Sequence, residues 1–139
     1  MIILDTNVLS ALMRAEPDLA VASWLDRQPA ESIWTTAITV FEIRFGLHLL
    51  TDSRRRQQLE ALFHTVMQDG LNQRILPVDA LATQHASVLA ATRQKAGRPV
   101  DFRDTLIGGI AEARRASLAT HNTRHFADLS VPLIDPWAA

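Results

Sequence analysis

The stretch MIILDTNVLSAL, residues 1–12, places an apolar run first, then an acid and an amide, and then apolar residues at helical spacing. The run Ile2 to Leu4 is too short for a signal peptide or a membrane span, so it predicts a buried strand. Asp5 ends that strand and can cap the helix that follows. Asp5 is therefore either a plain helix cap or a functional acid at a strand end.

Composition limits the classes of protein that remain. A chain of 139 residues is expected to form one domain, residues 1–139, and no apolar run approaches the ~20 residues of a membrane span. The absence of cysteine excludes disulfides, zinc–thiolate sites and thiol nucleophiles, and a reducing cytoplasm is the simplest location. The net charge of -1 argues against nucleic-acid binding through a broadly basic surface, although it does not exclude a nuclease.

Arginine supplies nearly all of the positive charge, and Lys95 is the only lysine. A guanidinium can bind phosphate with two parallel hydrogen bonds, so this bias would suit phosphate recognition. It is equally consistent with a GC-rich genome.

Short β-prone runs alternate with helical patterns along the chain. The runs are Ile2 to Leu4, Ile33 to Ala37, Ile75 to Val78, Leu118 to Thr120 and Pro132 to Ile134. Amphipathic helices are predicted over residues 17–25, 40–50, 54–67, 80–96 and 104–116. This alternation predicts an α/β fold with a central parallel sheet of about five short strands and helices on both faces.

Ligands of an open parallel sheet bind beyond the carboxyl ends of its strands. Asp5 closes the first predicted strand, and Glu42 lies in the first turns of the helix after the second. Asp104 opens the helix before the fourth strand, and Asn122 follows that strand. We therefore expect these four residues to converge at one edge of the sheet.

Glu42 and Asp104 each have a structural alternative. Glu42 has no arginine or lysine three or four residues on, but a capping box with Thr39 as the N-cap would explain it. Asp104 and Asp101 could both serve the dipole of a helix N-terminus, or both could be ligands. Gly46 and Gly108 each lie one turn beyond an acid. Because glycine costs about 1 kcal/mol in a helix, they predict a close approach beside Glu42 and Asp104.

Other polar residues are weaker candidates. Asp79 precedes a helix and Asp135 precedes a proline, so an N-cap and a turn are the favoured interpretations. His121 and His125 flank Asn122 and could touch a phosphate, but two surface histidines are the simpler interpretation.

A pocket of carboxylates with no lysine or arginine among them stays ionised only if a cation balances it. Carboxylate and amide oxygens favour Mg²⁺ or Mn²⁺, which suits attack by water on a phosphodiester. Two other phosphate chemistries fit less well. An aspartyl phosphatase usually has Asp-x-Asp after its first strand, where this chain has Asn7, and a phosphorylated receiver domain needs a lysine near its end.

The stretches IILDTNVLSAL, ITVFEIRFGL, DTLIGGIAEARRASLATHNTRHF and PLIDPW together resemble a PIN domain, and specifically the FitB-like branch of the VapC-type toxin ribonucleases. The resemblance implies a Mg²⁺- or Mn²⁺-dependent endoribonuclease that cuts single-stranded RNA. It also implies a homodimer and neutralisation by a small VapB-type antitoxin, through which the pair would contact DNA.

The resemblance implies roles for particular residues. The family's acids fall on Asp5, Glu42 and Asp104, with Asp5 and Asp104 expected as direct metal ligands and Glu42 acting through a bound water. The fourth position falls on Asn122, where the sequence departs from those members of the family that carry an aspartate, so a second metal site would lose a charge. His125 is a further departure, because related chains often have an acid after the Asn-x-Arg segment. The competing hypothesis is a weakly catalytic or non-catalytic PIN-fold module that acts with an antitoxin in DNA-bound autoregulation.

Overall fold

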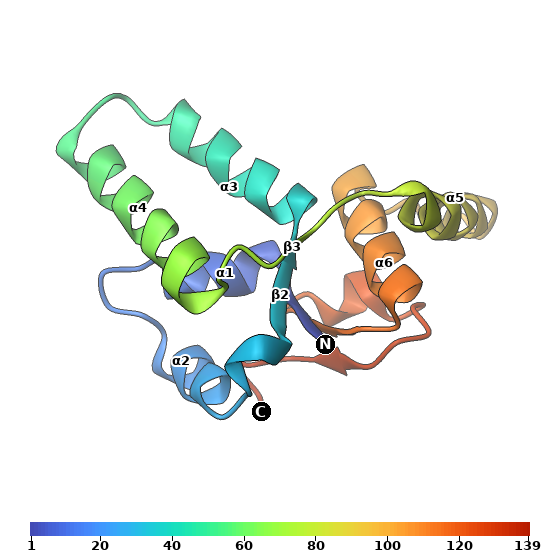
Figure 1. Ribbon diagram of the computed structural model, residues 1–139. Helices are drawn as coiled ribbons and strands as arrows, with labels where there is room; N and C mark the ends of the chain where they lie inside the picture. Colours follow the sequence, from blue (N-terminus) through green and yellow to red (C-terminus); the bar gives the residue numbers. More distant parts are fainter.

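The computed structural model describes residues 1–139 as a five-stranded parallel sheet with helices on both faces (Figure 1). The sheet has the order β3-β2-β1-β4-β5, so that β1 is its central strand. The strands are β1 (Ile2–Leu4), β2 (Ile33–Thr36), β3 (Ile75–Leu76), β4 (Ser117–Ala119) and β5 (Leu133–Ile134). The predicted fold class is confirmed, and each of the five predicted runs overlaps one strand.

Six α-helices cover the sheet. They are α1 (Thr6–Leu12), α2 (Leu19–Asp26), α3 (Ala37–Leu49), α4 (Arg54–Thr65), α5 (Ala80–Lys95) and α6 (Phe102–Arg114). Short 3₁₀ turns occupy Ala30–Ser32 (η1) and Thr123–Phe126 (η3), and a π-helical turn, Val66–Gly70 (η2), follows α4. None of these helices is long and apolar enough to cross a membrane.

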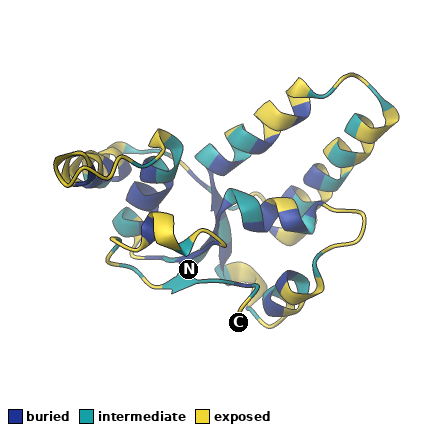
Figure 2. Cartoon of the chain, turned by 180° about the vertical axis from the view of Figure 1, so that it is seen from behind, coloured by how far each residue is buried: buried dark blue, intermediate teal, exposed yellow.

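The two faces of the sheet bury separate hydrophobic cores. Leu4 packs with residues of α1 to α4, including Val8 and Phe63, whereas Ile3 packs with residues of α5 and α6, including Ile110. Successive strand residues point to opposite faces, so β1 contributes to both cores. Figure 2 shows the buried positions along the sheet and on the inner sides of the helices.

The helix boundaries differ from the predicted ones where polar side chains cap helix ends. The second strand stops at Thr36, whose hydroxyl accepts a hydrogen bond from the Thr39 amide at 3.1 Å, so α3 starts at Ala37 rather than at residue 40. Asp101 caps α6 in the same way, and this helix starts at Phe102 rather than at Asp104. The apolar periodicity could not locate these ends because caps are polar.

Glycine fixes the packing of α5 against α6. A Cβ atom at Gly109 would lie 2.6 Å from the Ala86 Cβ and 2.7 Å from the Ala82 carbonyl oxygen. The expectation of close approaches beside the acids was only partly right. Gly108 does have close neighbours, but these are leucine side chains of the core, and Gly46 has no atom within 4 Å of its Cβ position.

Candidate active site

Asp5 lies at the carboxyl end of the central strand, buried beneath the edge of the sheet. Only 3% of its surface is exposed. One carboxylate oxygen accepts a hydrogen bond from the Thr6 amide at 2.8 Å, and the other accepts one from the hydroxyl of Thr120, directly after β4, at 2.7 Å. Asp5 is therefore the N-cap of α1, but it is also joined to the neighbouring strand.

Burial raises the pKa of Asp5 from 3.8 to about 6, against the lowering effect of the hydrogen bonds from Thr120 and Thr6. The negative charges of Asp104 and Glu42 raise this pKa further. The structure therefore brings these three acids within electrostatic reach of one another. A plain helix cap needs neither burial nor two like charges nearby, so capping does not account for the whole environment of Asp5.

Glu42 faces α1 from α3. One of its carboxylate oxygens accepts a hydrogen bond from the Thr6 hydroxyl at 2.9 Å, and Thr6 also lies 3.1 Å from the Thr39 hydroxyl. The capping-box alternative for Glu42 is wrong, because the N-cap of α3 is Thr36 and Glu42 turns to another element instead. Thr6 thus joins the first strand end to the second through its side chain.

Asp104 occupies the first turn of α6, and its carboxylate lies 3.1 Å from the Nδ1 atom of His125 in η3. Asp101, by contrast, is exposed and accepts hydrogen bonds from the amide and the guanidinium of Arg103. These contacts lower the pKa of Asp101, chiefly through the side-chain hydrogen bond. Asp101 is thus the cap of α6, and its contacts join it to Arg103 rather than to the other acids.

The expectation that no arginine lies among the acids is wrong. An Nη atom of Arg103 lies 3.7 Å from a carboxylate oxygen of Glu42. The hydrogen bond and charge of Asp101 raise the pKa of Arg103, and the charges of Glu42 and Asp104 add to this effect. Apolar neighbours of Glu42 in the sequence gave no sign of this contact, because Arg103 comes from a distant helix.

Asn122 lies just after β4 and is joined to the site through its backbone. Its amide donates to the Thr120 hydroxyl at 3.0 Å, and its carbonyl accepts from the His125 amide at 3.0 Å. Its carboxamide is exposed and forms no hydrogen bond within the chain. Asn7 was missed as a site residue, yet its side chain accepts from the His121 amide at 3.1 Å and so ties α1 to the end of β4.

The remaining candidates have structural roles. Asp79 caps α5 and pairs with Arg114 at 3.0 Å, and Asp135 accepts a hydrogen bond in a turn, as expected for both. His121 lies 3.4 Å from Asp135 and packs against Trp137, with ring centres 4.5 Å apart. His125 alone among the weaker candidates contacts one of the three acids.

The donor set fits a hard divalent cation. Each carboxylate oxygen has two lone pairs. Oδ1 of Asp5 accepts only from the Thr6 amide and keeps acceptor capacity, whereas Oδ2 accepts from the Thr120 hydroxyl and, at 3.5 Å, from the Asn7 side-chain amide. No three His, Asp or Glu side chains lie close enough to form a metal cage by themselves. An ion that keeps several waters, as Mg²⁺ does, needs only one or two protein carboxylates. Asp5 and Asp104 could supply these.

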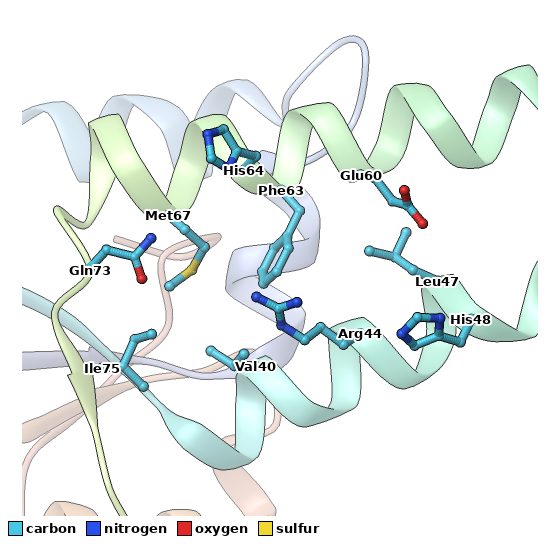
Figure 3. Close-up of a pocket in the computed structure, with 10 residues that line it drawn as sticks. All are labelled: Val40, Arg44, Leu47, His48, Glu60, Phe63, His64, Met67, Gln73 and Ile75. Carbon is cyan, nitrogen blue, oxygen red and sulfur yellow. The ribbon is translucent and has the colours of Figure 1, made fainter.

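Two cavities adjoin α3. One, of about 300 Å³, lies between α3 and α4 and contains none of the three acids; there the Arg44 guanidinium lies 5.5 Å from the centre of the Phe63 ring (Figure 3). The other, of about 310 Å³, is lined by Thr6 and Glu42 and continues past Gly46 to Leu59 of α4. Of the three acids, only Glu42 lines this second cavity.

The fold and the strand-end acids define a class of protein. The family model described as PIN domain matches residues 2–131, and the chain belongs to this family. Within it, the chain is similar to VapC ribonuclease Y4jK of Sinorhizobium fredii, with 36% identity over 99% of this chain and 98% of that protein. It is also similar to toxin FitB of Neisseria gonorrhoeae, with 30% identity over 99% of each chain.

Solved structures resemble the chain over its whole length. The crystal structure of FitAcB from Neisseria gonorrhoeae superposes with a TM-score of 0.84 at 29% identity and covers 100% of both chains. A structure of FitAB bound to an IR36 DNA fragment gives a TM-score of 0.88 at 30% identity and covers 99% of this chain and 96% of that one. The predicted PIN-like fold and the resemblance to VapC- and FitB-type toxins are therefore confirmed.

Proposed function

We propose that the chain is the toxin of a VapBC-type toxin–antitoxin module and acts as a Mg²⁺- or Mn²⁺-dependent endoribonuclease on single-stranded RNA. The observation that carries this proposal is the convergence of Asp5, Glu42 and Asp104, from three different elements, around a buried carboxylate with a raised pKa. The relatives named VapC ribonuclease and toxin FitB support the same activity.

Asp5 and Asp104 would hold the metal, and Glu42 would orient a water molecule from α3. When bound, a divalent ion lowers the pKa of water and neutralises the charge that develops on the phosphodiester. Thr120 and the Thr6 amide fix the Asp5 carboxylate between two strands, so its oxygens need little reorganisation on binding. Asn122, whose backbone is joined to Thr120 and His125, would help to position that water with its neutral carboxamide.

Exposed apolar residues support the proposal of protein partners. Phe41, Phe45 and Leu49 form a stripe along α3 with 55, 49 and 70% of their surface exposed. Val88 on α5 and Phe102 on α6 are further exposed apolar side chains, with 65 and 74% of their surface exposed. Exposed apolar surface of this kind fits contact with protein partners, and the proposed partners are a small VapB-type antitoxin and a second copy of the chain. DNA would be contacted only through the antitoxin.

The second candidate function is a PIN-fold module with little catalysis that acts with an antitoxin on DNA. Two observations favour it, the neutral side chain of Asn122 and the cation that Arg103 places against Glu42. The similarity to a toxin–antitoxin complex solved on DNA is consistent with either function.

Cleavage by matched variants separates the two functions. The purified chain should cut a labelled single-stranded RNA in Mg²⁺ or Mn²⁺ and stop when a chelator is added. Asp104→Asn should lose at least about 100-fold in rate, because it removes a ligand charge. Asp69→Asn, on an exposed turn, is the control prepared in the same way. Equal cleavage by the wild type and Asp104→Asn would mean that a contaminant supplies the activity. The PIN-fold module with little catalysis would then be the remaining candidate function.

A further inference from the structure

The candidate active site has a charge problem that its acids alone do not solve. RNA approaches as a polyanion, and Asp5, Glu42 and Asp104 repel it. A divalent ion balances part of this charge, but single-strand binding generally also uses cationic side chains along the backbone. With a net charge of -1, the chain has no excess of positive charge to supply this broadly. A cationic side chain at the rim of the site would supply this positive charge locally.

Arg103 is that cation. It sits in the first turn of α6 next to Asp104, with 43% of its side chain exposed and an Nη atom 3.7 Å from Glu42. A guanidinium has five N–H donors, and here only the Nε–H makes a hydrogen bond within the chain, at 3.3 Å to Asp101. The 3.7 Å contact is too long for a hydrogen bond. Both Nη groups therefore keep their donors for a ligand.

A comparison with Arg93 shows what a purely structural arginine looks like in this chain. Arg93 is 4% exposed, and its guanidinium donates to Asp128, to the Thr105 hydroxyl and to the His125 carbonyl. All three of its nitrogens are engaged within the protein. Arg103 differs in exposure and in unused donors, and it alone has a guanidinium within 4 Å of one of the three acids.

We propose that Arg103 binds a phosphate of the RNA substrate at the edge of the acidic site, through the Nη donors that face away from Asp101. Asp101 anchors the Nε side of the guanidinium and leaves the opposite side free, which suits bidentate contact with phosphate oxygens. Glu42 holds the same cation near the acids before substrate binds. This role rests on the proposed function, because it assigns the substrate contact of that same site.

The test measures RNA affinity against salt. A fluorescein-labelled single-stranded RNA of 12 nucleotides is titrated with the full chain in Ca²⁺, and its length is checked afterwards. Arg103→Gln should weaken binding roughly three- to tenfold at 0.1 M salt and reduce the slope of log affinity against log salt by about 0.7, the value for one phosphate contact on a single strand. Arg103→Lys should keep the slope, because it retains the charge.

Arg114→Gln is the matched control. Arg114 lies on the same helix, about 16 Å along its axis, has 39% of its side chain exposed and pairs with one aspartate, Asp79. The Arg114→Gln substitution removes the same charge as Arg103→Gln but should leave the slope of log affinity against log salt unchanged. Equal slopes for the wild type and Arg103→Gln would overturn the phosphate contact, as would equal loss in both glutamine variants, which would indicate only a change in net charge.

Metal binding distinguishes this role from support of the acids. In calorimetric titration with Mn²⁺ alone, Arg103→Gln should bind at least as tightly as the wild type, because it removes a positive charge beside Glu42. A collapse of Mn²⁺ affinity would instead make Arg103 a residue that positions the acids, and would overturn the proposal. If the wild type neither binds nor cuts RNA, the proposed function itself fails.

Discussion

Replacing Asp5 by asparagine should stabilise the chain at neutral pH when no metal is present. The folded protein raises the pKa of Asp5 from 3.8 to about 6 because burial disfavours the charged form. The folded state therefore holds this proton more tightly than the unfolded state does. The contribution of Asp5 to stability is therefore fully present below about pH 4, is lost as the pH rises through 6, and is absent above that. A rise of the pKa from 3.8 to about 6 corresponds to about 3 kcal/mol.

Asparagine carries no charge and can keep the contacts of Asp5 with Thr6 and Thr120, although it loses the 3.5 Å hydrogen bond from the Asn7 side-chain amide. Its carbonyl oxygen can accept from the Thr6 amide, and its amide group can donate to the Thr120 hydroxyl oxygen. Asp5→Asn should therefore gain up to about 3 kcal/mol over the wild type at pH 7. For 139 residues this is about 10 °C in Tm. The gain should vanish near pH 4, where Asp5 of the folded wild type is protonated.

Thermal unfolding followed by circular dichroism in chelator, from pH 4 to pH 8, measures this difference. Adding Mn²⁺ should then raise the Tm of the wild type only, by the equivalent of about 2.7 kcal/mol at 100 times the dissociation constant. If Asp5→Asn is less stable than the wild type by the same amount at every pH, the carboxylate is a favourable hydrogen-bond acceptor and not a strained charge. The reasoning from burial would then be refuted.

Three further substitutions test the packing and the fourth site. Gly109→Ala should lower the free energy of unfolding in urea by about 1–3 kcal/mol, because its Cβ would lie 2.6–2.8 Å from atoms of α5, whereas Gly46→Ala should raise it by up to about 1 kcal/mol, since its Cβ position is open. Asn122→Asp should tighten Mn²⁺ binding several-fold in calorimetric titration, because a carboxylate attracts the ion more strongly than an amide. Unchanged or weaker binding would place this side chain outside the metal site.

Much of the fold could be predicted from the sequence because the sheet is buried on both faces. Runs such as Ile2 to Leu4 are apolar throughout, and the helices between them repeat with a clear period. The ends of the strands and helices were harder to predict from the sequence. Thr36 could be read as the last residue of a strand or as a cap, and only the hydrogen bond to Thr39 shows that it is both. The role of Gly109 was overlooked because the atoms that a Cβ at this position would meet belong to α5, more than twenty residues away in the sequence.

Acids at strand ends were predictable because the topology of a parallel sheet fixes where strand ends meet. The neutral and cationic residues that contact these acids could not be predicted from the sequence. Thr120 looked like a strand residue and Thr6 like part of a cap, yet both hold Asp5. The pairing of Arg103 with Glu42 joins residues 61 positions apart on different helices. No local pattern reports such a contact, because the spacing rules of a helix reach only three or four residues.

The central place of β1 has a consequence for how the chain is made. Asp5 is among the first residues synthesised, but its partner Thr120 lies on the far side of the chain, beyond β4. At about 5–20 residues per second, a ribosome takes roughly 6–23 s to travel from residue 5 to residue 120. A growing chain that ends before residue 104 contains two of the three acids and only one of the two strands that flank β1. On the proposed function, an interrupted translation product that lacks Asp104 should therefore not cleave RNA.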